Sequence, residues 1–216
     1  MRTRSLVLLF TGVSATLMSG QSKLAPDIDP TSFSRLAPLD RAALDDDGKK
    51  VWDYIANGRA LPATGPAQVS MHSPGAAKPI HELNQYLRKT VVGPRYFELS
   101  ALIAAREFDQ QYEWGGHEPA GRRAGLQPAV IDAVKHNRDV AGLPEKDATV
   151  IRLGRALFRD HKVSPALWAK TVELFGRQGA VEITAIMGDY AMAAVMLTAV
   201  DQQLPPGREA LLPVRP

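Results

Sequence analysis

The spacing of apolar residues constrains this 216-residue chain most strongly, because no segment alternates apolar and polar residues at the period of two that a half-buried β-strand needs. Apolar residues instead recur every three or four positions, which places them on one face of an α-helix. The pattern therefore predicts an all-α protein. We expect its helices at residues 39–57, 78–89, 94–108, 109–125, 128–136, 146–160, 164–176 and 179–202.

Proline and capping side chains set several of these boundaries. Pro94 suits a first helical turn, where the backbone N–H that proline lacks would have no partner. Asp109 and Ser164 have the short polar side chains that cap helix N-termini, so each is expected to begin a helix. Pro119 removes a backbone donor in the middle of a helix and predicts a kink near His117.

The first 20 residues have the pattern of a signal peptide. Arg2 and Arg4 precede an apolar stretch, residues 5–18, that is too short to cross a bilayer comfortably. We expect export to the periplasm or the medium, with no stable membrane insertion after removal of residues 1–20. Cleavage after Gly20 and after Ala25 fit equally, and an uncleaved N-terminal anchor is the alternative.

The remaining chain has the size and composition of a single domain. Its 45% hydrophobic content supports one substantial core. Residues 21–38, rich in Pro, Asp and Ser, predict an extended N-terminal arm, residues 39–205 one helical domain and residues 206–216 a C-terminal tail. A formal net charge of only +3, without a basic block or interleaved aromatic residues, argues against a nucleic-acid partner.

Cysteine is absent from the chain. Disulfides, thiolate metal sites and thiol catalysis are therefore excluded. An exported protein without disulfides must be held together by its core.

Chemically capable residues gather between Glu98 and His117. Gln110, Glu113 and His117 follow the spacing i, i+3 and i+7, so on a helix they share one face, with Glu113 one turn from His117. A carboxylate beside an imidazole suits proton transfer. The alternatives are a solvated Glu98 and an ordinary helix-stabilising pair of Glu113 with His117.

With Glu98 included, this spacing resembles E-x11-C-x2-C-x3-H, the active-site pattern of the alkylhydroperoxidase D and carboxymuconolactone decarboxylase superfamily. Gln110 and Glu113 stand in the places of its two cysteines. The similarity spans roughly residues 40–205 and includes M-H-S-P (71–74), Y-L-R-K-T (86–90), G-P-R-Y-F-E-L (93–99), A-G-L-Q-P-A-V-I-D-A-V (124–134) and E-L-F-G-R-Q-G-A-V-E (173–182). It implies a helical bundle with two related halves, here residues 78–136 and 146–202, and a homo-oligomer, trimer or hexamer.

The resemblance implies catalytic roles for Glu98 and His117 as proton-relay residues, with Glu113 beside them. A carboxylate at Glu113 cannot reduce a hydroperoxide, because that reaction needs an oxidisable sulfur, so thiol peroxidase activity is not expected. We expect a cofactor-independent acid/base enzyme, a lyase that transfers a proton on a small unsaturated or lactone-bearing acid, as in decarboxylation. Isomerisation and lactone hydrolysis stay open. The alternative is an inactive small-molecule-binding or structural oligomeric protein of the same fold.

Five further residues are weaker candidates for substrate binding: His72, Arg95, Gln110, Trp114 and Tyr190. Each has a simpler interpretation, such as a backbone-bonded loop histidine, a surface arginine, or aromatic residues of the core or of a subunit contact. Glu98, Glu113 and His117 also supply three potential metal ligands. Because E-x3-H differs from the E-x-x-H of di-iron bundles, we expect no bound metal.

Overall fold

The computed structural model describes residues 24–213, so the predicted signal peptide at residues 1–20 lies outside it. Within the described range there are eight α-helices and no β-strand, which confirms the all-α prediction. A 3-10 turn at Arg41–Ala43 and a π-helical turn at Ala156–Asp160 complete the elements. The helices are α1 (Asp46–Ala56), α2 (Pro66–Ser70), α3 (Pro74–Leu87), α4 (Gly93–Glu107), α5 (Gln111–Arg123), α6 (Pro128–Lys135), α7 (Glu145–Arg155) and α8 (Pro165–Ala199).

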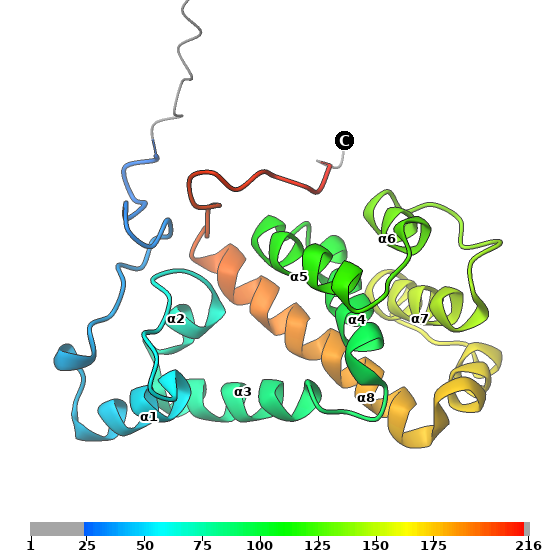
Figure 1. The fold of residues 1–216 in the computed structure, drawn as a ribbon, viewed down its shortest axis with the longest axis horizontal. Coiled ribbons are helices and arrows are strands. Elements are labelled where there is room, and N and C mark those ends of the chain that lie inside the picture. Colours follow the sequence, from blue (N-terminus) through cyan, green and yellow to red (C-terminus); the bar gives the residue numbers. More distant parts are fainter. Residues whose placement is uncertain (1–23, 214–216) are drawn as a thin grey trace, which may run out of the picture.

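Helix α4 forms the centre of the fold, because most of its length is buried on all sides. It packs against α5, α6, α7 and α8, and Leu99, Leu102 and Ile103 are at most 2% exposed. Helix α8 crosses the middle of the molecule, with α1, α2 and α3 on one side and α4 to α7 on the other (Figure 1). This arrangement places the N-terminal helices opposite α5, across the end of α8.

Helix α8 is interrupted at one residue. Gly176 has φ 70° and ψ 168°, outside the helical region, so the segment consists of two helices, as the sequence predicts. Ser164 begins it as expected, with its hydroxyl accepting from the backbone N–H of Leu167 at 3.2 Å. By length and apolar composition alone α8 is long enough to span a membrane, and half of its most apolar window is buried inside the fold.

Two predicted details around α5 are wrong. Asp109 does not cap this helix, because its backbone is left-handed (φ 50°); the Gln110 side chain takes that role and accepts from the N–H of Tyr112 at 3.1 Å. Pro119 does not interrupt α5, which is helical from Gln111 to Arg123. Pro119 lies on the exposed side, where water can satisfy the carbonyl that loses its donor.

The segments before and after the helices lie on the helical body. The backbone N–H of Arg35 donates to Val200 at 2.8 Å, which ties the arm to the end of α8. Near the C-terminus, the Gln111 side-chain amide bonds both the N–H (3.0 Å) and the carbonyl (2.7 Å) of Leu212. Leu212 is consequently buried against the core. The proposed domain limits and the relation between the two halves stay predictions.

Candidate active site

His117 is held between two carboxylates from different helices. His117 belongs to α5, and its Nδ1 lies 2.7 Å from Oε2 of Glu98 on α4. Its Nε2 lies 3.4 Å from Oε2 of Glu113, one turn earlier on α5. All three side chains are at most 12% exposed. The structure therefore brings together the three residues that the sequence motif singled out.

The two carboxylates determine the charge of His117. Burial by itself lowers the pKa of this imidazole, because removal from water disfavours the charged ring. The hydrogen bonds with Glu113 and then Glu98 act in the opposite direction and outweigh burial. Together they raise the pKa from 6.5 to about 9. His117 is thus an imidazolium at neutral pH, with a proton available on each nitrogen.

Two aromatic rings pack against the imidazole. The Tyr190 ring from α8 meets it edge to face, with 4.5 Å between the ring centroids. Phe97 from α4 contacts both rings, at 6.4 Å from His117 and 5.5 Å from Tyr190. These contacts restrict the orientation of the His117 ring.

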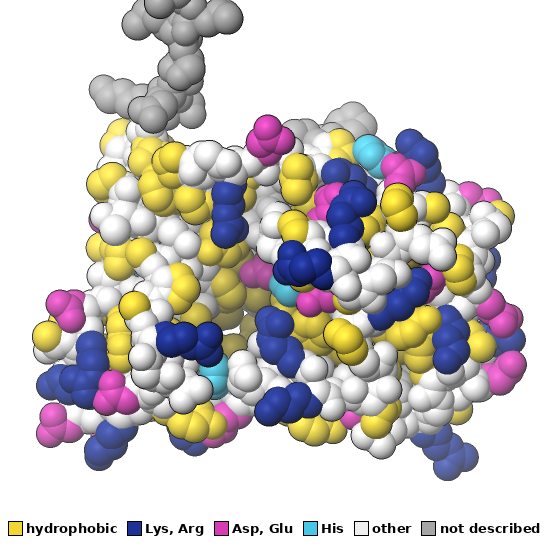
Figure 2. Space-filling view, in the orientation of Figure 1, with side chains coloured by type: hydrophobic (Ala, Val, Ile, Leu, Met, Phe, Trp, Pro, Cys, Tyr) yellow, Lys and Arg dark blue, Asp and Glu magenta, His cyan; other side chains and the backbone are white. Residues whose placement is uncertain are grey.

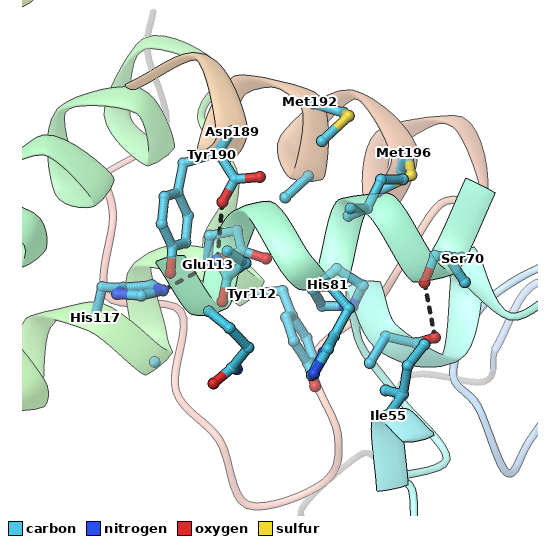
Figure 3. A pocket seen from close by; sticks show the side chains of 18 of the residues that line it. Ile55, Ser70, His81, Tyr112, Glu113, His117, Asp189, Tyr190, Met192 and Met196 are labelled. Atoms are coloured by element: carbon cyan, nitrogen blue, oxygen red, sulfur yellow. Dashed lines mark hydrogen bonds and ion pairs between the residues drawn. The ribbon is translucent and has the colours of Figure 1, made fainter. Parts of the chain in front are cut away.

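The imidazole borders a cavity of about 540 Å³ between the N-terminal helices, α5 and α8. Figure 2 shows a hollow near the middle of one face, with acidic and histidine side chains on part of its rim. Inside, His117, Glu113 and Tyr190 lie at one end, whereas Ile55, Ser70 and Met196 lie toward the other (Figure 3). Glu98 stands behind the imidazole and is not part of the cavity wall.

Glu113 borders the cavity, and only one of its two carboxylate oxygens has a partner among the described residues. Its Oε2 faces His117, whereas its Oε1 is buried and has no hydrogen-bond partner among the described residues. A buried carboxylate oxygen without a partner is costly, since it has lost water and gained nothing in return.

Four of the weaker candidates do not reach the cavity. His72 is exposed in the segment that follows α2. Arg95 forms an ion pair with Asp147 at 2.6 Å. Gln110 caps α5 and donates to Thr198 Oγ1 at 3.2 Å. Trp114 is fully buried in the core, and its indole N–H donates to Glu118. The expectation that these residues line the site is corrected, because each side chain is engaged or points elsewhere.

Tyr190 does line the cavity, and three neighbours that sequence reasoning missed join it. Arg88 donates to the hydroxyl group of Tyr190 at 3.0 Å. Asn84 links Arg88 to Asp189, because it accepts from Arg88 at 2.9 Å and donates to Asp189 at 2.8 Å. Burial raises the pKa of Asp189, against the lowering effect of the Asn84 hydrogen bond. Asn84 and Arg88 lie one turn apart at the C-terminal end of α3, and their spacing alone does not link them to Tyr190.

Metal ligation has no ready place in this arrangement. Among residues 24–213, no group of three or more His, Asp or Glu side chains is placed to hold a metal ion. Both nitrogens of His117 face carboxylates, at 2.7 and 3.4 Å.

No family model matches the chain, and no curated protein matches it by sequence. Solved structures do match. The alkylhydroperoxidase AhpD core of Ralstonia eutropha JMP134, an uncharacterized peroxidase-related protein, superposes with a TM-score of 0.60 at 20% identity over 81% of this chain and 93% of that one. The debrominase Bmp8 gives 0.59 at 15% identity over 79% and 91%. A protein of unknown function from Agrobacterium tumefaciens, a candidate antioxidant defence protein AhpD, gives 0.58 at 17% identity over 65% and 98%.

At these identities the likeness concerns the fold, and it covers nearly the whole length of each matched structure. It agrees with the resemblance that the sequence carries around Glu98, Glu113 and His117. The chain therefore has the alkylhydroperoxidase D-like helical fold, built here without any cysteine.

Proposed function

We propose that this protein is an acid/base enzyme that transfers a proton on a small organic acid, with His117 as the general acid. The observation that carries the proposal is the position of its imidazole between Glu98 and Glu113 at the wall of a cavity. A pKa of about 9 keeps the ring protonated at neutral pH. A positioned acid of this kind accelerates proton transfer by roughly 10²- to 10⁴-fold.

The two hydrogen bonds of the imidazolium have different roles in this proposal. The short bond to Glu98 holds Nδ1 and fixes the ring. The longer contact of 3.4 Å with Glu113 leaves the Nε2 proton easier to divert. A substrate atom that enters beside Glu113 can take over this proton, while Glu113 stabilises the ring before and after the transfer.

We favour a decarboxylase-like reaction. The bond between the carboxyl carbon and its neighbour breaks, carbon dioxide leaves, and the electron pair stays on a carbon conjugated to a carbonyl group. The Nε2 proton of His117 then adds to that carbon, and solvent returns a proton to the imidazole. Isomerisation uses the same transfer without the loss of carbon dioxide.

Peroxide reduction and other thiol chemistry form no part of this proposal, because the chain has no cysteine. Debromination is the activity of one structural neighbour and does not transfer on the basis of a shared fold. We further propose that the protein is exported, because its first 20 residues have the pattern of a signal peptide, and that it assembles as a homo-oligomer, as the sequence resemblance implies.

Solvent exchange tests the proposal whatever the product is, because it follows the transferred proton itself. The purified protein is incubated in D₂O with a panel of conjugated and lactone-bearing acids, and NMR records deuterium at carbon together with carbon dioxide release. We expect exchange with the wild type and a loss of roughly 10²-fold or more in His117→Gln. His136→Gln, which changes a half-exposed histidine outside the cavity, is the matched control. Equal exchange by both variants would contradict the role of His117, and binding without exchange would favour a binding protein.

A further inference from the structure

We propose that Arg88 and Tyr190 form an anion-binding subsite beside His117, and that the far end of the same cavity receives an apolar group. The ligand class is then an amphipathic carboxylate, with its acid group at Arg88 and its apolar part toward Met192 and Met196. This inference deepens the proposed function and rests on it for the catalytic use of the site. The binding that it describes is measurable without turnover.

The hydrogen bonds that orient Arg88 go to neutral groups. It caps the C-terminal end of α3, and its Nε donates to Oδ1 of Asn84 at 2.9 Å. Its Nη2 donates to the hydroxyl of Tyr190 at 3.0 Å, and its guanidinium lies 4.9 Å from the centroid of the Phe97 ring. None of the ion pairs formed by residues 24–213 includes Arg88, in contrast to Arg95, which pairs with Asp147.

A guanidinium with a fixed direction and no direct ion pair is suited to a carboxylate, even though Asp189 acts on it through space. Its planar N–H groups match the two oxygens of that group, and little side-chain freedom remains to be lost on binding. Asp189, the acid of α8 near this position, bonds to Asn84 instead, at 2.8 Å. Arg88 also belongs to the cavity wall, so a ligand reaches it from the same space that borders His117.

Tyr190 supplies the second donor. Its hydroxyl oxygen accepts from Arg88, which leaves its own O–H directed to another acceptor. Burial raises the pKa of this phenol, so it keeps its proton at every physiological pH. Because the Tyr190 ring also contacts the imidazole, a carboxylate bound to both donors lies next to His117.

Apolar side chains gather toward the opposite end of the cavity, beside Ser70. The apolar residues of the cavity wall include Ile55, Leu61, Ile80, Met192 and Met196. Figure 3 shows Met192, Met196 and Ile55 displaced from His117 and Tyr190 along the cavity. A volume of about 540 Å³ falls within the range of pockets that hold drug-sized ligands, well above the needs of a two-carbon acid. Methionine side chains adapt to apolar groups of varied shape.

Calorimetry with three simple probes tests the proposal on the wild-type protein. We expect octanoate to bind, and octanamide, its neutral counterpart, to bind roughly ten- to hundredfold more weakly, because it lacks the charge for Arg88. Shorter acids from hexanoate to acetate should lose roughly three- to fourfold in affinity per methylene. Equal binding of octanoate and octanamide, or no binding of either, would overturn the anion subsite.

Variants locate the two ends. Arg88→Gln should bring octanoate and octanamide to similar affinities, whereas Arg123→Gln, an exposed arginine outside the cavity wall, should leave their ratio unchanged. Met196→Gln keeps the side-chain length and should weaken octanoate without affecting acetate. A ratio unchanged by Arg88→Gln, or a chain-length dependence unchanged by Met196→Gln, would contradict the assigned ends.

The outcome is separable from that of the proposed function. His117→Gln retains Arg88 and Tyr190, so it should still distinguish octanoate from octanamide even though proton exchange is lost. Selective binding without exchange by any variant would refute the enzyme and keep the subsite. Exchange on uncharged compounds that bind as well as acids would refute the subsite and keep the enzyme.

Discussion

Nδ1 of His117 lies 2.7 Å from Oε2 of Glu98, a hydrogen bond that joins α5 to α4 inside the protein. The two residues are 19 positions apart, and no local helix geometry brings them together. Their contact depends on the packing of α5 against the buried α4. This bond, together with the Glu113 contact on the other nitrogen, sets the charge of the imidazole.

Stability should depend on pH through this bond. Folding raises the pKa of His117 from 6.5 to about 9, so its contribution is complete below about pH 6.5 and disappears as the pH rises through 9. The difference corresponds to roughly 3 kcal/mol of unfolding free energy. Urea unfolding across this interval should show a smaller loss in Glu98→Gln than in the wild type. Parallel losses in the two proteins would show that the ion pair does not control the titration.

The two carboxylates should differ in their kinetic effects. Glu113→Gln removes the acceptor on the cavity side and should lower kcat by roughly 10²- to 10⁴-fold with little change in KM. Either substitution removes a partner that raises the pKa of His117, so the alkaline fall in activity should move to lower pH in both variants. The pH profile of kcat for proton exchange measures both. Glu82→Gln is the control: it removes an exposed carboxylate that pairs with Lys78, and its pH profile of kcat should match that of the wild type.

Trp114 should behave as a core residue. Its indole is fully buried and donates to Glu118 at 2.6 Å, so Trp114→Phe should lower the unfolding free energy by about 1–3 kcal/mol. Octanoate affinity should stay unchanged. Trp168→Phe, at a site 40% exposed, should cost less than about 0.5 kcal/mol. Normal stability together with weakened octanoate binding in Trp114→Phe would instead show that Trp114 belongs to the ligand site.

Two glycines offer a matched test of the helix packing. A β-carbon on Gly154 of α7 would overlap Ile103 of α4, so Gly154→Ala should destabilise the fold by about 1–3 kcal/mol. Gly188 in α8 has open space around the same position, so Gly188→Ala should stabilise it by about 0.5–1 kcal/mol. Thermal unfolding compares the pair. Similar effects of both substitutions would contradict the close approach of α4 and α7.

Local sequence chemistry predicts much of the helical order. Pro94, Pro128 and the Ser164 cap mark helix starts to within a residue, because proline and capping side chains act within one turn. The first helix is shorter than predicted, since Asp45 accepts from Gly48 and begins α1 after a separate 3-10 turn. The left-handed backbone of Asp109 could not be predicted, because aspartate is common both at helix caps and in turns.

Part of the candidate site could likewise be predicted from local sequence, and part could not. Glu113 and His117 lie one turn apart, so their spacing alone predicts their contact, and the motif adds Glu98. Arg88 and Asn84 lie on α3, and only the packing of that helix on α8 brings them to Tyr190. Tertiary contacts of this kind leave no pattern in a single sequence. Arg95 is a further example, because it pairs with Asp147 of α7, which is distant from it in the sequence.

Titration of the His117 imidazole by NMR tests the central claim most directly. With ring-labelled histidine and the signal assigned through His117→Gln, the wild type should titrate with a pKa of about 9. Glu98→Gln and Glu113→Gln should each lower that value. A wild-type pKa near 6.5, unaffected by either substitution, would contradict the account, because His117 would then be neither charged by its two neighbours nor poised as an acid.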